Sequence, residues 1–79
     1  MAKYRVELLD RTVQRALDRI REPDFSRVAQ TILRLEDNPR PPGCRKLHGK
    51  DGWRVRVGNW RVIYYIDDQE RVVTIVDIK

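Results

Sequence analysis

The stretch WRVRVGNWRVIYY, residues 53–65, decides the fold that this sequence predicts. Two runs of residues that favour strands, 53–57 and 60–66, flank Gly58 and Asn59. Both turn residues tolerate a positive φ, so they predict a two-residue hairpin turn. Such a turn fixes the register of the two strands and therefore decides which side chains share a face.

The predicted register separates the apolar residues of the hairpin from its arginines. The turn places Val57 opposite Trp60, and the earlier pairs follow from it. The face that we expect the rest of the chain to cover carries Trp53, Val55, Val57, Trp60, Val62 and Tyr64. The other face carries Arg54, and Arg56 directly opposite Arg61. Like charges in such a pair, about 5 Å apart, destabilise a sheet, so local stability is a poor reason for this arrangement.

The remaining segments predict two more strands and two helices. Residues 3–10 alternate apolar and charged residues like a half-buried strand, and residues 72–79 form a final apolar strand. Helical periodicity runs from 11 to about 22 and from about 25 to 37. We therefore predict an α+β fold with an N-terminal strand, an antiparallel helix pair and a three-stranded antiparallel meander. Both helices should pack on one face of the sheet.

The helices have predicted caps and buried faces. Asp10 suits the N-cap of the first helix, Asp24 or Ser26 suits that of the second, and Pro23 breaks the chain between them. The apolar stripe of the first helix comprises Val13, Ala16, Leu17 and Ile20. The second helix is expected to bury Phe25, Val28, Ala29, Ile32 and Leu33, with Leu35 at the margin of the stripe.

Length and charge limit the classes of function. The 79 residues predict one domain, 1–79, because a chain this short has no material for a second core. Lys and Arg number 17 against 12 Asp and Glu, which points to an anionic partner such as nucleic acid, and a charge that only prevents aggregation is an equal alternative on composition alone. One cysteine and one histidine exclude an internal disulfide and argue against a zinc site. We expect a cytoplasmic protein without a membrane span.

A basic loop borders the hairpin. Residues 38–52 contain three of the four prolines and three of the four glycines, and the basic residues Arg40, Arg45, Lys46 and Lys50. With the three arginines of the hairpin, this loop favours an anion site. Two structural roles remain as alternatives to an anion site for these arginines. They can lie over apolar neighbours, or they can pair with Asp67, Asp77 or the terminal carboxylate.

Three guanidiniums at this spacing can hold one or two phosphates and stabilise charge on a phosphate in a transition state. Groups for proton transfer are scarce, because His48 lies in the loop and no base is near Cys44 in the sequence. No spacing of metal ligands is visible, so no metal or other cofactor is expected. Tyr65 shares the face of the arginines and can stack on a base.

The run KLHGKDGWRVRVGNWRVIYYIDDQERVVTIVDIK, residues 46–79, follows a strand, a helix pair and the break at Asn38 and Pro39. With these elements it resembles the RelE/ParE superfamily of toxins from type II toxin-antitoxin modules, and it is most similar to the RelE branch. The resemblance implies a cytoplasmic toxin that enters the ribosomal A site, cuts mRNA there and inhibits translation. It also implies the ribosome, mRNA and a RelB-like antitoxin as partners.

The resemblance implies roles for particular residues. Arg61 corresponds to the family's arginine that stabilises charge on the scissile phosphate. Arg54 and Arg56 correspond to basic residues that are often lysines in the family. A lysine can act as a base, whereas an arginine is effectively always protonated, so Arg54 and Arg56 are predicted to clamp phosphate. The residues predicted to contact RNA are Arg45, Lys46, Lys50 and Tyr65.

A second and larger departure from the family lies after the last strand. The family's arginine and tyrosine that follow the last strand are not among these 79 residues. Either the chain has been cut short, or the protein is a natural weak or inactive member. Two more functions stay open: a ParE-like inhibitor of DNA gyrase, and an inactive toxin that only binds its antitoxin. The density of basic residues on the sheet favours the RelE branch.

Overall fold

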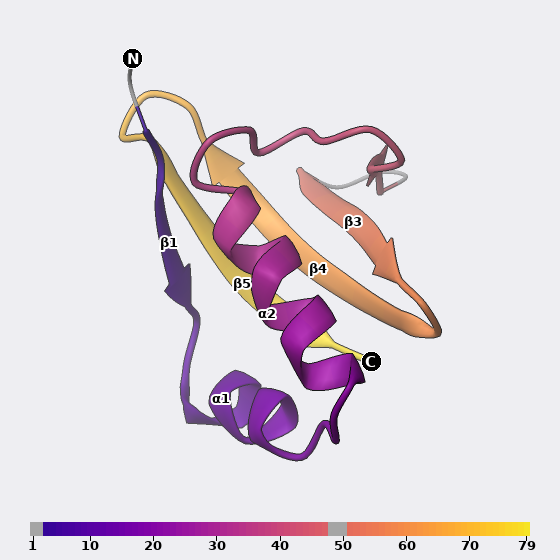
Figure 1. The fold of residues 1–79 in the computed structure, drawn as a ribbon. Coiled ribbons are helices and arrows are strands. Elements are labelled where there is room, and N and C mark those ends of the chain that lie inside the picture. The colour runs from indigo at the N-terminus through magenta and orange to yellow at the C-terminus, as the bar shows by residue number, and fades with distance from the viewer. Residues whose placement is uncertain (1–2, 48–50) are drawn as a thin grey trace.

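The structure is a computed structural model that describes residues 3–47 and 51–79. Over these residues, five strands and two helices form an α+β fold, in which both helices lie on one face of a single sheet (Figure 1). This architecture confirms the predicted fold class. The elements are β1 (Arg5–Leu8), α1 (Arg11–Asp18), α2 (Asp24–Arg34), β2 (Arg45–Lys46), β3 (Gly52–Val57), β4 (Trp60–Asp67) and β5 (Val72–Ile78).

The strands are arranged in the order β1-β5-β4-β3-β2. β3, β4 and β5 form the predicted antiparallel meander. β1 runs parallel to β5, so the first and last strands of the chain lie side by side near one edge (Figure 1). β2 was not predicted, and it lies within the segment that we expected to be a loop throughout.

The predicted register of the hairpin is confirmed. Val57 pairs with Trp60 and Arg56 pairs with Arg61, around a turn in which Gly58 has a φ of 60°. The predicted apolar face is the one that the helices cover, since Val62 and Tyr64 are fully buried there. The core between the sheet and the helices comprises Val13, Ile20, Val28, Ile32, Leu35, Val55, Val62, Tyr64, Val73, Ile75 and Ile78.

The N-cap prediction is confirmed for α1 and wrong for α2. The Asp10 carboxylate accepts hydrogen bonds from the backbone N–H groups of the first turn of α1, at 3.0 and 3.2 Å. α2 begins at Asp24, whose carboxylate instead accepts a hydrogen bond from Trp60 Nε1 at 3.1 Å. The Ser26 backbone N–H donates to the Glu22 carboxylate at 2.9 Å. Glu22, rather than Asp24 or Ser26, therefore satisfies a free donor of this first turn.

Both helices end earlier than predicted, α1 at Asp18 and α2 at Arg34. After α2 the Leu35 N–H donates to the Ile32 carbonyl at 3.1 Å, a bond between residues three apart. This 3₁₀ geometry places such residues in line along the helix, so Leu35 is fully buried while Leu33 is 60% exposed. The prediction that Leu33 is buried and Leu35 marginal is therefore wrong. No helix in the described ranges is long and apolar enough to cross a membrane.

Candidate functional site

The sheet face away from the helices carries the three predicted arginines. Arg56 and Arg61 form one cross-strand pair, and Arg54 lies opposite Ile63 in the next pair on this face. The short strand β2 places Arg45 opposite Arg54. Four arginines from three neighbouring strands thus occupy two adjacent rows of the sheet. We call Arg45, Arg54, Arg56 and Arg61 the arginine face.

Within the described part of the chain, the arginines of this face lack acidic partners. Among residues 3–47 and 51–79, no carboxylate oxygen lies within 4.0 Å of any of their guanidinium nitrogens. Asp67 instead accepts hydrogen bonds from two backbone N–H groups of the β4–β5 turn. Asp77 pairs with Lys79 at 3.7 Å. Ion pairs among the described residues therefore do not explain why four arginines gather on this face.

Arg54 is the most constrained of the four arginines. Its side chain is half-buried, and its Nε is buried with no hydrogen-bond partner among the described residues. Burial is the largest cause that lowers the pKa of Arg54, followed by the positive charges of Arg56, Arg45 and Arg61. Because a guanidinium stays protonated at neutral pH, Arg54 keeps a positive charge that a bound anion would offset.

A cleft of about 460 Å³ lies against the arginine face. This volume is within the range of about 300–1,000 Å³ that is typical of small-molecule sites. Ile63 contributes to its apolar lining, and its polar lining includes Arg54, Arg61, Tyr65, Asp77 and Lys79. The cleft therefore combines two free guanidiniums with an aromatic ring and a carboxylate, a set that suits a nucleotide unit.

A β-bulge in β5 brings Asp77 to this cleft. Tyr64 pairs with Ile75 but Ile63 pairs with Asp77, so β5 contains one extra residue, Val76. Without the extra residue Asp77 would lie opposite Val62 on the core face. From the sequence, Asp77 was considered only as a partner for an arginine, and its place in the cleft was not predicted. The buried residues Ile75 and Ile78 of β5 are three positions apart, whereas a regular strand places every second residue on one face. This spacing could have indicated the bulge from the sequence.

Tyr65 lies on the same face as the cleft, opposite Gly52 of β3. A Cβ atom at Gly52 would lie only 2.8 Å from Tyr65 Cε1 and 3.0 Å from Leu47 Cδ1. The ring therefore lies close against the glycine backbone, and it is still 45% exposed. The structure thus brings Tyr65, a predicted RNA contact, together with Arg54 and Arg61, the predicted catalytic residues that line the cleft.

Lys46, another predicted RNA contact, does not lie on the arginine face. Lys46 pairs with Trp53, which belongs to the helix-covered face, so Lys46 lies on the opposite side of the sheet from Arg45. Lys50, together with His48, lies outside the described residues. Within the described ranges, no group of three or more His, Cys, Asp or Glu residues is arranged to hold a metal ion.

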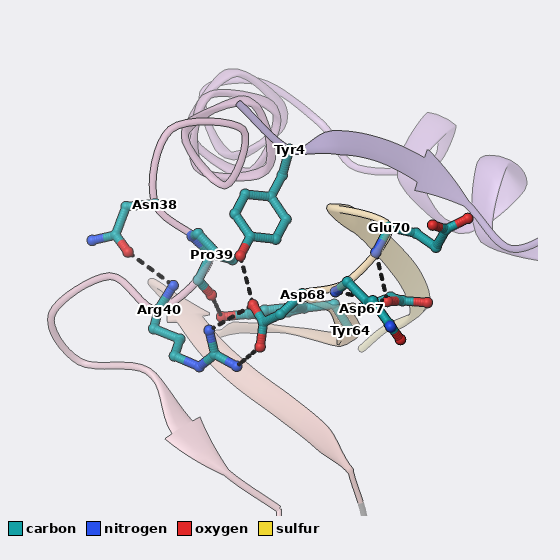
Figure 2. Close-up of polar contacts among 9 residues, drawn as sticks. Tyr4, Asn38, Pro39, Arg40, Tyr64, Asp67, Asp68 and Glu70 are labelled. Carbon is teal, nitrogen blue, oxygen red and sulfur yellow. Dashed lines mark hydrogen bonds and ion pairs between the residues drawn. The ribbon is translucent and has the colours of Figure 1, made fainter. Parts of the chain in front are cut away.

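Arg40 of the basic loop has a structural contact network (Figure 2). Its guanidinium donates to both carboxylate oxygens of Asp68, at 3.2 and 2.9 Å, and lies 5.0 Å from the centroid of the Trp53 ring. Tyr4 Oη donates to the same carboxylate at 2.5 Å. The hydrogen bonds from Arg40 and then Tyr4 lower the pKa of Asp68 to about 2. This network ties the loop and the N-terminal strand to the β4–β5 turn.

Comparison with known proteins shows the family to which this chain belongs. A family model described as "ParE toxin of type II toxin-antitoxin system, parDE" matches residues 5–79, nearly the whole chain. The chain belongs to this family, within the RelE/ParE superfamily of type II toxins. No curated protein sequence matches it at a significant level.

Solved structures share the fold. The chain is 30% identical, with a TM-score of 0.85, to a chain of the archaeal RelE-RelB complex from Pyrococcus horikoshii OT3, and the match covers 100% of this chain and 94% of that one. For the RelBE2 toxin-antitoxin complex from Mycobacterium tuberculosis the TM-score is 0.83 at 22% identity, with coverages of 98% and 96%. For the intact E. coli RelBE complex it is 0.80 at 17% identity, with coverages of 95% and 93%. These last two similarities bear on the fold alone.

Proposed function

We propose that this toxin is a ribosome-dependent endoribonuclease that cuts mRNA in the A site and thereby inhibits translation. The observation that carries the proposal is the arginine face, whose guanidiniums have no carboxylate partner among the described residues. Arg54, whose Nε is buried without a hydrogen-bond partner among the described residues, also lines the cleft, where its guanidinium would bind a phosphate. The proposed function implies a cytoplasmic location and involves no metal or other cofactor.

The geometry supports distinct roles for the arginines. Arg54 and Arg61 both line the cleft, so a phosphodiester bound there would receive hydrogen bonds from two guanidiniums. In the reaction of the RelE branch the ribose 2′-OH attacks the adjacent phosphate, and Arg61 would stabilise the negative charge that develops on its oxygens. Arg56 and Arg45 lie beside the cleft-lining arginines in the sheet and would hold the neighbouring backbone.

The Arg61→Ala variant tests this function. We expect it to abolish mRNA cleavage on ribosomes in a cell-free translation system, while the far-ultraviolet circular dichroism spectrum stays unchanged. Arg27→Ala is the matched control, because Arg27 is exposed on α2 and its loss changes the net charge equally. Cleavage by Arg61→Ala at the rate of the unchanged protein would refute the role of Arg61. The absence of cleavage by the unchanged protein would refute the proposed function.

The family description favours a second candidate, ParE-like inhibition of DNA gyrase. A gyrase supercoiling assay beside the mRNA cleavage assay separates the two functions. An endoribonuclease leaves supercoiling unaffected at concentrations that arrest translation, whereas a gyrase inhibitor gives the opposite result. The cluster of free guanidiniums on the sheet favours the endoribonuclease, because it provides a site for scissile phosphate.

A RelB-like antitoxin is the protein partner that we propose. Structures of three similar toxins are described as complexes with RelB antitoxins or as RelBE toxin-antitoxin complexes. On the helix side the chain has an apolar groove of about 400 Å³, with Leu33 at its exposed side. An apolar groove can accept the apolar face of a partner helix, which supports a protein partner. The apolar residues of the groove are Val6, Leu8, Leu17, Ala29, Ile32 and Leu33.

If the protein only binds an antitoxin, it forms this complex but cleaves no mRNA. Copurification with the product of the adjacent gene tests the partner independently of cleavage. A stable complex supports the antitoxin proposal, and its absence counts against it. Cleavage by the free toxin, together with inhibition by that partner, would exclude a role limited to antitoxin binding.

A further inference from the structure

The arginine face has no group that can accept a proton. Cleavage by a ribose 2′-OH requires a base to remove its proton as the oxygen attacks phosphorus. Guanidiniums stay protonated, so Arg54, Arg56 and Arg61 can bind the phosphate but cannot perform this step. Among the described side chains that line the cleft, Asp77 alone is a carboxylate, and the lysine there, Lys79, is paired with it at 3.7 Å.

The bulge in β5 places Asp77 where a base is needed. In its row of the sheet, Ile63 lies between Asp77 on one side and Arg54 on the other. Because neighbouring strands are about 4.8 Å apart, Asp77 and Arg54 rise from the sheet about 10 Å apart. Arg61 lies two residues before Ile63 on β4. A phosphate held by Arg54 and Arg61 would therefore have Asp77 beside it, with space for a ribose in the cleft.

The Asp77 carboxylate is available to a substrate. Its side chain is 49% exposed, and its partner is the Lys79 ammonium at 3.7 Å. That distance exceeds the 2.7–3.2 Å that is usual for a hydrogen bond. No side chain in the described part of the chain donates a hydrogen bond to the carboxylate, so both oxygens can accept one from a hydroxyl.

We infer that Asp77 is a catalytic residue that accepts the proton of the ribose 2′-OH, an inference that rests on the proposed endoribonuclease function. In the step, the O2′–H bond breaks and its proton moves to the Asp77 carboxylate. The O2′–P bond forms while the P–O5′ bond breaks, and the departing O5′ takes a proton from water. The products are a 2′,3′-cyclic phosphate and a 5′-hydroxyl, and Asp77 later returns its proton to water.

A purely electrostatic role for Asp77 makes a different prediction. If the carboxylate only offsets the positive charge of the arginine face, its removal strengthens RNA binding and leaves cleavage unchanged or faster. If it is the base, its removal also strengthens binding or leaves it unchanged, yet it slows cleavage by about 10²–10⁴-fold. Binding and cleavage must therefore be measured separately.

The experiment compares Asp77→Asn with Asp37→Asn on ribosomes programmed with mRNA. Asp37 is a matched control, because it is 70% exposed, forms a surface pair with Lys3 at 3.6 Å and lies after α2, outside the cleft. Binding is measured with an mRNA that carries a 2′-deoxynucleotide at the cleaved position, which cannot react. We expect Asp77→Asn to bind this mRNA complex at least as tightly as the unchanged protein and to lose cleavage, while Asp37→Asn keeps both.

Asp77→Glu provides the second variant, since it keeps the carboxylate and moves it by one methylene. We expect its cleavage rate to lie between those of Asp77→Asn and the unchanged protein. Cleavage by Asp77→Asn within about threefold of the unchanged protein, or an equal loss in both variants, would overturn the assignment of Asp77. If the unchanged protein cleaves no mRNA, the proposed function fails and this inference fails with it.

Discussion

Arg56 lies directly opposite Arg61 across the β3–β4 hairpin, and neither has a carboxylate oxygen within 4.0 Å among the described residues. Directly opposed like charges destabilise a sheet by roughly 0.2–1 kcal/mol. The folded protein therefore keeps an unfavourable pair in the centre of its arginine face. This arrangement is expected of a site that binds a polyanion, because ligand phosphates relieve the repulsion.

Replacing Arg56 with Thr tests whether the pair serves binding rather than stability. We expect Arg56→Thr to leave the free energy of unfolding unchanged or to raise it by up to about 1 kcal/mol, measured by urea denaturation. RNA binding should weaken, and the slope of log K against log salt should fall by about 0.7 for a lost contact to single-stranded RNA.

Arg5→Thr is the control for Arg56→Thr, since Arg5 is also an exposed strand arginine but pairs with Glu7 at 2.6 Å. Its loss should leave stability unchanged or slightly lower, and should leave the salt slope as it was. A clear loss of stability in Arg56→Thr would show that the residue has a structural role that the cross-strand pair does not reveal.

The contact between Arg40 and Asp68 predicts a dependence of stability on pH. The pKa of Asp68 is lowered to about 2 from an ordinary value near 3.9. The folded state thus favours the ionised carboxylate, so the stabilisation is complete above about pH 5 and is lost as the pH falls through the folded pKa. We expect Asp68→Asn to lower the free energy of unfolding near pH 7.

The difference between Asp68→Asn and the unchanged protein should shrink between about pH 4 and pH 2. Urea denaturation at several pH values measures it. Both side chains of the pair are substantially exposed, so solvent screening keeps the effect small. A difference that stays constant down to pH 2 would mean that Asp68 stabilises the fold through something other than its charge.

The hairpin could be predicted from the sequence because its register depends on a local feature, the two-residue turn at Gly58 and Asn59. Once this register was known, the separation of Val62 and Tyr64 from Arg56 followed from the alternation of side chains. The main part of the arginine face could therefore be predicted from the sequence. Whether its arginines have partners was not, because that depends on residues far along the chain.

The features that were not predicted depend on contacts between residues that are far apart in the sequence. β2 has only two residues and is defined by its pairing with β3, in which Arg45 lies beside Arg54. Arg40 belongs to the same basic loop, but Asp68 and Trp53 hold it away from the arginine face. Charge alone did not distinguish these two arginines. Pairing with Arg54 places Arg45 on the arginine face, whereas contacts with Asp68 and Trp53 give Arg40 a structural role.

The two tyrosines of β4 allow a matched test of burial. Tyr64 is fully buried, and its Oη donates to the Pro39 carbonyl at 2.8 Å (Figure 2). Burial raises its pKa, which keeps the hydroxyl protonated as a donor. Tyr64→Phe would leave the buried carbonyl without this donor, so we expect a loss of about 1–3 kcal/mol in urea denaturation.

Tyr65→Phe is the control, because Tyr65 is 45% exposed and its hydroxyl forms no hydrogen bond within the described ranges. Its free energy of unfolding should stay within about 0.5 kcal/mol of the unchanged protein. RNA binding should also persist, since the phenyl ring can still stack on a base. Equal losses of stability in the two variants would contradict a specific contribution from the bond to Pro39.

The apolar groove predicts how an antitoxin complex responds to a charge. Leu33 lines the groove and is 60% exposed, so Leu33→Glu should leave the fold intact. A carboxylate in an apolar contact must lose its hydration when the partner binds, and we expect the affinity to fall at least tenfold, about 1.4 kcal/mol. Leu9→Glu is the control, because Leu9 is 57% exposed but does not line the groove. Calorimetric titration with the adjacent gene product measures both, and equal affinities would place the antitoxin on another surface.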